Sequence, residues 1–178
     1  VGEQKKLLCA MINSAEAVKL VKDNVKNIRL EVKQKEYDGE SHNVIAQLPG
    51  VRDEYIVLSA HYDSTTLSHG AYDNMSGCAG LLGIMEKLKD KKLNYGLRFV
   101  FCGSEERGLL GSKAYVKEHK DELENIVFNI NLDMIGTYMG KFIACVSAEN
   151  KLSHYISYMA AEVGFPVASR TGVYSSDS

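Results

Sequence analysis

The chain has 178 residues, of which 45% are hydrophobic and 25% are charged, and its formal net charge is −2. These values are typical of one globular domain with a sizeable core. The small net charge gives no indication of binding to nucleic acid or to an anionic membrane surface, and no apolar run reaches the ~18 residues that a membrane span requires. Because the chain begins with Val1 and not with Met, we expect it to start at a processing boundary within a longer protein.

The four cysteines, Cys9, Cys78, Cys102 and Cys145, are far apart in the sequence. No two of them have the C-x-x-C spacing of a thiolate zinc site or a redox pair. We interpret all four as reduced, buried, small hydrophobic residues. Unpaired cysteines favour a reducing, cytoplasmic compartment. A secreted or cell-surface location stays open, because we expect the N-terminus of the whole protein to be missing.

The first half of the chain predicts one helix and three strands. The helix runs from Asn13 to Asn24, with Ser14 as its N-cap. Apolar and charged residues alternate from Ile28 to Val32, which predicts a half-buried strand. Further strands are expected at Asn43 to Leu48 and at Tyr55 to Ala60. The last of these is nearly all apolar, so we expect a central strand that is covered on both faces.

The second half of the chain alternates helices and strands. Five apolar residues share one face of a helix from about Ser76 to Lys89, namely Cys78, Leu81, Leu82, Met85 and Leu88. The other expected elements are the strands Leu97 to Cys102, Ile126 to Leu132 and Lys141 to Val146, and the helices Leu109 to Glu118 and Asn150 to Val163. This alternation predicts an α/β sandwich with a mixed, largely parallel sheet.

Residues that can bind metal stand where hydrophobic runs end. They are His61, Asp73, the pair Glu105 and Glu106, and Asp133. In open α/β sheets, ligands bind beyond the carboxyl ends of the strands, so we expect these side chains to meet at one edge of the sheet. One imidazole and several carboxylates suit a divalent metal ion, above all zinc. The pattern therefore predicts a metal-dependent hydrolase.

Each of these residues also has an ordinary structural explanation when it is taken alone. Asp73 opens a helix and is either an N-cap or a carboxylate that bridges two metal ions. Glu105 and Glu106 are either a solvated acidic turn or a metal ligand beside a general base. Asp63 lies two residues after His61, so its carboxylate is either solvated or accepts the ring N–H and orients the other nitrogen toward a metal.

The motifs SAHYDS, GAYDNMSG, SEERGLLGS and NLDMIG, in this order, closely resemble those of the co-catalytic di-zinc aminopeptidases of metallopeptidase family 28. The match extends from about Asn43 to Gly136, and a weaker similarity continues to the end of the chain. It implies a zinc-exopeptidase fold, a three-layer sandwich in which a mixed, mostly parallel sheet is flanked by helices. Residues 43–178 would be the catalytic domain without its C-terminal part. Residues 1–42, with a helix and a strand, would be the tail of an upstream lobe or the start of that domain.

The resemblance also assigns the metal ligands. It implies that His61 and Asp133 bind one zinc ion, that Glu106 helps to bind a second, and that Asp73 bridges both. The catalytic residues that it implies are Glu105 as the general base and Asp63 as the acid that orients the His61 ring.

The expected activity is that of a zinc-dependent exopeptidase, an aminopeptidase that hydrolyses N-terminal peptide bonds with metal-activated water. Its substrate would be a peptide with a free N-terminus. Two alternatives stay open, namely a relative that cyclises N-terminal glutamine or acts as a carboxypeptidase, and a catalytically inert fragment of a peptidase. A receptor-like protein that has lost its metals is disfavoured, because such a protein would be expected to have lost ligand residues.

One expected metal ligand has no counterpart in the chain. The family uses a further histidine late in the domain, beyond the region where Ser178 ends this chain, and none of the other histidines lies in a matching context (His42, His69, His119 and His154). We therefore expect two zinc ions in a complete catalytic domain and nearer one in this segment. The incomplete C-terminal edge also leads us to expect self-association.

Overall fold

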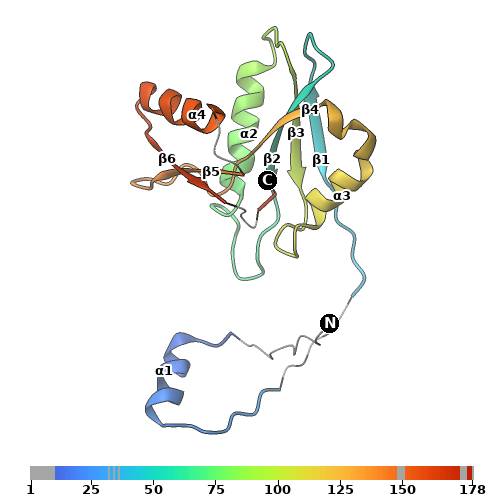
Figure 1. Cartoon of the computed structure of the whole chain (residues 1–178). Helices are drawn as coiled ribbons and strands as arrows, with labels where there is room; N and C mark the ends of the chain where they lie inside the picture. Colours follow the sequence, from blue (N-terminus) through green and yellow to red (C-terminus); the bar gives the residue numbers. More distant parts are fainter. Residues whose placement is uncertain are drawn as a thin grey trace, which may run out of the picture. The chain divides into compact units, whose positions relative to one another are not determined.

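The computed structural model describes residues 11–31, 33, 35, 37–147, 151–172 and 176–177 (Figure 1). The chain forms two compact units, residues 1–39 and residues 40–178, and each is considered by itself. None of the helices in the described part of the chain is long and apolar enough to cross a bilayer.

The first unit contains the helix α1 (Ser14–Lys22). Its N-cap is Asn13 and not Ser14 as predicted, because the Asn13 side chain accepts a hydrogen bond from the backbone N–H of Ala15 at 2.8 Å. The strand predicted from Ile28 to Val32 is wrong for the described residues 28–31, which have no regular structure, and Val32 itself is not described. An alternating pattern forms a strand only when a neighbouring strand pairs with it, and the described residues of this unit contain none.

The second unit is built on a four-stranded sheet with the strand order β1-β3-β2-β4. Strand β2 (Tyr55–His61) is parallel to β3 (Gly96–Cys102) on one side and to β4 (Ile126–Asn131) on the other. Strand β1 (Val44–Leu48) is antiparallel to β3 at the edge of the sheet. The sheet is therefore mixed and mostly parallel, as the sequence predicts.

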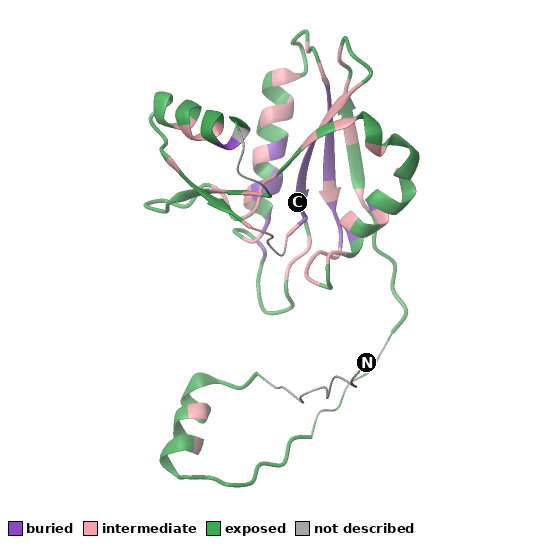
Figure 2. Ribbon diagram, viewed as in Figure 1, coloured by how far each residue is buried: buried purple, intermediate pink, exposed green. Residues whose placement is uncertain are grey.

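Helices cover both faces of this sheet. On one face, Leu58 and Phe99 pack with Leu81 of α2 (Met75–Leu88). On the other face, Val57 and Val100 pack with the side chain of Tyr115. Tyr115 belongs to α3 (Leu110–Glu118), which the 3₁₀ helix η1 (Lys120–Asn125) follows. The predicted three-layer sandwich is confirmed, and the buried residues gather on the two central strands (Figure 2).

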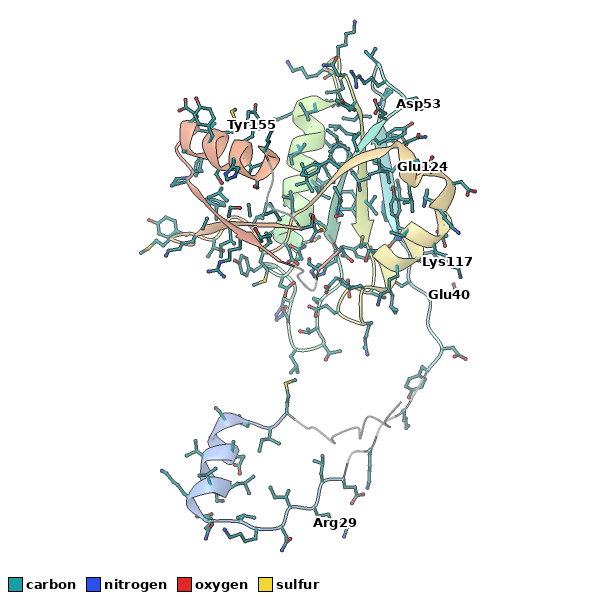
Figure 3. The ribbon with its side chains drawn as sticks, in the orientation of Figure 1. Arg29, Glu40, Asp53, Lys117, Glu124 and Tyr155 are labelled. Carbon is teal, nitrogen blue, oxygen red and sulfur yellow. The ribbon has the colours of Figure 1, made fainter. Side chains whose placement is uncertain are left out.

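Charged residues lie on the outside of the α3 layer. Lys117 of α3 and Glu124 of η1 are exposed on its outer surface (Figure 3). Beneath this layer Arg98 of β3 is buried, and its guanidinium binds the Glu122 carboxylate at 2.7 Å and the Tyr115 hydroxyl at 3.2 Å. This contact ties η1 and α3 to the sheet.

A second sheet pairs β5 (Phe142–Val146) with β6 (Val167–Thr171) in parallel, and α4 (Lys151–Glu162) connects them. The sequence did not predict β6, because its five residues VASRT contain three polar side chains and no long apolar run.

Two predictions about burial are wrong. Leu82 of α2 is 56% exposed, because the buried face follows Cys78 and Leu81 and the next residue is turned about 100° away from it. Cys145 is exposed on β5, whereas Cys78 and Cys102 are buried as expected. Cys9 lies outside the described residues.

Candidate metal centre

Three parallel strands bring the predicted site residues together. In the register of the sheet, His61 at the end of β2 lies opposite Cys102 at the end of β3, and Ser59 lies opposite Asn131 at the end of β4. Glu105 follows β3 by three residues and Asp133 follows β4 by two. The carboxyl ends of parallel strands meet at one edge, so both side chains lie near His61.

The imidazole of His61 is the centre of the cluster. It is 2% exposed. Its Nε2 atom lies 3.2 Å from Asp73 Oδ1, 3.7 Å from Asp133 Oδ1 and 4.0 Å from Glu105 Oε2. One ligand atom each from His61, Asp73 and Asp133 lies within 4.8 Å of the others. These three residues can therefore face one metal ion.

A cavity of about 400 Å³ opens over this cluster. The residues that line it are His61, Asp73, Glu105, Glu106, Gly108, Leu109, Asp133 and Met134. Glu106 thus reaches the same cavity, but the structure does not bring it into the group of three ligand atoms. The cavity carries four carboxylates and no lysine or arginine among the described residues that line it, so its potential is negative.

Asp63 holds the site by contacts that the sequence did not predict in this form. The Nδ1 atom of His61 lies 3.1 Å from the backbone carbonyl oxygen of Asp63 and 3.6 Å from its carboxylate, so the closer partner is the backbone. The Asp63 carboxylate instead accepts the backbone N–H groups of Glu105 and Glu106, at 2.9 and 3.1 Å. Asp63 therefore orients the ring through its main chain and fixes the two glutamates through its side chain.

The electrostatics of the cluster favour a positive charge at His61. Burial alone would lower the pKa of the ring, but the hydrogen bond and charge of Asp133 and the charge of Glu105 outweigh burial and raise it to about 9. The pKa of Asp133 is lowered, first by its hydrogen bond to His61. Burial raises the pKa of Glu105, and the nearby acids Asp177 and Glu106 add to this increase. In the metal-free protein a proton on His61 balances part of the acidic charge.

Sequence reasoning missed a chain of polar side chains behind Asp133. The hydroxyl of Ser59 donates to Asn131 Oδ1 at 2.9 Å, and Asn131 Nδ2 donates to Ser176 Oγ at 2.7 Å. The Ser176 hydroxyl then donates to Asp133 Oδ2 at 2.7 Å. This contact leaves Oδ1 of Asp133 facing His61. The contacts join residues that are up to 72 positions apart, so no local sequence signal could have revealed them.

The histidine that would complete a second metal site is not found near the cluster. Among the described residues, no histidine other than His61 belongs to a group of potential metal ligands. His119 ends α3, where its ring stacks on Tyr115 and its Nδ1 atom lies 3.0 Å from the backbone carbonyl oxygen of that residue. It has a structural role there.

Comparison with known proteins finds similarity to aminopeptidases. Aminopeptidase YwaD of Bacillus subtilis (strain 168) is 37% identical over 130 residues, which are 70% of this chain and 29% of that protein. Leucine aminopeptidase 2 of Trichophyton rubrum is 41% identical over 97 residues, which are 53% of this chain and 20% of that protein. The structure of a zinc aminopeptidase from Bacillus subtilis superposes with a TM-score of 0.67 at 33% sequence identity.

The chain is short compared with these relatives. The superposition on the zinc aminopeptidase covers 76% of this chain and 35% of the other. The chain thus spans about a third or less of the length of the proteins that it matches. The sequence profile of peptidase family M28 matches residues 43–177, which is most of the chain. The chain therefore belongs to peptidase family M28.

Proposed function

We propose that this chain forms the metal-binding core of a zinc-dependent aminopeptidase. The observation that carries the proposal is the group formed by His61, Asp73 and Asp133, which lies beside Glu105 at the carboxyl ends of parallel strands. The similarity to a zinc aminopeptidase and to other aminopeptidases supports both the metal and the reaction.

The donor set fits zinc. One imidazole nitrogen and two carboxylate oxygens are ligand types that zinc takes in catalytic sites, where a further position is left for water or substrate. Their ligand atoms lie within 4.8 Å of one another, and the raised pKa of His61 marks a position where positive charge is stabilised. Zinc, when bound, lowers the pKa of a water molecule and polarises the carbonyl group of a substrate.

Glu105 is the proposed general base. Its side chain is 13% exposed and faces the cluster, with Oε2 at 4.0 Å from His61 Nε2. Burial of part of the side chain raises the pKa of the Glu105 carboxyl, which makes the carboxylate a stronger base than an exposed one. Glu105 would take the proton of the attacking water and return it to the leaving amine. Asp63 would keep Glu105 in place through the bond to its backbone N–H.

We further propose that one zinc ion is held tightly by this chain. Only His61, Asp73 and Asp133 bring their ligand atoms together in the described residues. A second ion would rely on Asp73 and Glu106 and would be held weakly. Elemental analysis after dialysis is expected to give nearer one zinc than two per chain. Two tightly held ions would show that another residue, from this chain or from a second copy, completes the second site.

The charge of the cavity favours a substrate with a free N-terminus. With Asp73 and Asp133 holding the zinc ion, the carboxylates of Glu105 and Glu106 would remain to attract the α-ammonium group of a peptide. A carboxypeptidase would need a cation free to bind the substrate carboxylate, and none of the described lining residues is a lysine or an arginine. We therefore favour an aminopeptidase over a carboxypeptidase.

Turnover of an aminoacyl chromogenic substrate tests this proposal. The zinc-loaded protein should release the amine, and Glu105→Gln should keep zinc and fold but lower kcat by roughly 10²–10⁴, the usual effect of a lost general base. Glu106→Gln should instead weaken the second metal. A zinc-loaded wild type with no turnover would contradict peptidase activity of this chain and would favour the alternative of a catalytically inert fragment. Release of ammonia from an N-terminal glutaminyl peptide, without cleavage, would identify the glutamine-cyclising alternative.

A further inference from the structure

The side chain of Asn74 joins the two segments that carry the carboxylates of the metal centre. Asn74 is 1% exposed and directly follows Asp73. Its Nδ2 atom donates to the carbonyl oxygen of Leu132 at 2.9 Å, and its Oδ1 atom accepts the N–H of Met134 at 3.1 Å. Leu132 and Met134 are the two neighbours of Asp133 in the chain. One amide therefore binds the backbone on both sides of one ligand residue and is covalently next to the other.

Gly77 makes this arrangement possible. It is buried in the first turn of α2, and Asn74 Oδ1 also accepts its backbone N–H at 3.0 Å. A Cβ atom at Gly77 would lie 2.3 Å from the Leu132 carbonyl oxygen and 2.6 Å from Asn74 Oδ1. Any larger residue would therefore push apart the two segments that Asn74 joins.

We propose that Asn74 is a positioning residue of the metal centre, which holds Asp73 and Asp133 at the separation at which both face His61. This inference rests on the proposed metal-binding function. The alternative role of Asn74 is helix capping alone, because it is the N-cap of α2. Capping needs only the bond to Gly77, whereas positioning needs the bonds to Leu132 and Met134.

Asn74→Ser separates the two roles. Serine is as good an N-cap as asparagine, but its shorter side chain leaves the backbone of Leu132 and Met134 without these bonds. We expect Asn74→Ser to keep the helical content and to lose roughly 10–100-fold in zinc affinity, as is usual when a group that supports a metal ligand is removed. Asn74→Asp keeps the acceptor for both N–H groups but loses the donor to the Leu132 carbonyl oxygen, so it should recover only part of the affinity.

Zinc affinity is measured by competition with a chromophoric chelator, and the visible spectrum of the cobalt-loaded protein reports on the geometry of the ligands. Met85→Ala is the matched control, because Met85 packs on the core from the same helix but outside the site. It should lower Tm and leave both readouts unchanged. Gly77→Ala is a second way to disturb the contact between Asn74 and Leu132, and it should lower zinc affinity although residue 74 is still asparagine.

The outcomes separate this inference from the proposed function. Wild-type zinc affinity and cobalt spectrum in Asn74→Ser would refute the positioning role and leave the metal centre standing. An equal loss of affinity in Met85→Ala would show that general destabilisation is the cause, and would also refute it. A wild-type chain that binds no zinc would overturn the metal centre and the role of Asn74 with it. If Asn74→Ser does not fold, the affinities of Asn74→Asp and Gly77→Ala decide.

Discussion

Zinc binding should strengthen steeply as the pH rises, because the metal must displace a proton from His61. The ring is buried, which by itself lowers its pKa, yet Asp133 and Glu105 raise the pKa from 6.5 to about 9. A metal ion binds only the neutral imidazole. In the metal-free protein at pH 7, the proton therefore occupies the position that zinc needs.

The size of the effect follows from the pKa. At pH 7 the ring lies about two pH units below its pKa, so roughly 99% of it is protonated. The apparent zinc affinity should then be about 100-fold below its value for the neutral ring, or ~2.7 kcal/mol at 1.36 kcal/mol per unit. The affinity should rise about tenfold per pH unit from pH 6.5 and level off near pH 9.

Competition with a chelator of known zinc affinity, repeated across this pH range, measures the slope. Glu105→Gln is the control, because it removes a charge that raises the pKa of His61 but is not a proposed zinc ligand. In this variant the plateau should begin at a lower pH. An affinity that stays flat between pH 7 and pH 8.5 would mean that His61 is neutral in the metal-free protein, and the electrostatic argument would then fail.

Three further predictions concern stability. The free energy of unfolding of the metal-free protein should fall by up to about 3 kcal/mol between pH 6.5 and pH 9, because the folded state raises the pKa of His61. The stabilising proton is fully present below pH 6.5 and is lost as the pH rises through 9. Urea titrations at several pH values measure this free energy, and a rise with pH would contradict the prediction. Asp63→Asn should cost about 1–3 kcal/mol in urea unfolding, because an amide leaves one of the N–H groups of Glu105 and Glu106 without an acceptor. Leu81→Ala should lower the free energy of unfolding by about 2–5 kcal/mol and Leu82→Ala by less than about 1 kcal/mol, because the first side chain is fully buried and the second is 56% exposed.

The central strands, and the clustering of the candidate site residues at their ends, could be predicted because each has a local signal. Strands β2 and β3 are mostly apolar runs, interrupted by Ser59 and by Arg98, as expected of strands that are covered on both faces. A charged residue directly after such a run cannot lie far from the core, and parallel strands bring their carboxyl ends to one edge. These two facts place His61, Glu105 and Asp133 together without knowledge of any contact between segments.

The errors arise where a feature depends on a partner that the local sequence does not specify. The alternation from Ile28 to Val32 predicts a strand, but no described strand of that unit pairs with it. The five residues of β6 form a strand because β5 pairs with them, although their own pattern is weak. Asp63 lies at the expected position, with its carboxylate 3.6 Å from His61 Nδ1, but no local pattern indicates that this carboxylate also accepts two N–H groups of the loop after β3. In each case the outcome depends on contacts between distant segments.

The same distant contacts explain how a cluster of like charges is kept together before a metal binds. Asp63 joins the end of β2 to the loop after β3, and Asn74 joins the start of α2 to the end of β4. All of these contacts are made by backbone groups or by side chains that are not proposed metal ligands, so they form without the metal. The repulsion among the carboxylates is then offset by the proton on His61. Zinc would enter a site whose geometry already exists, so its affinity would be limited by displacement of that proton and not by the ordering of loops.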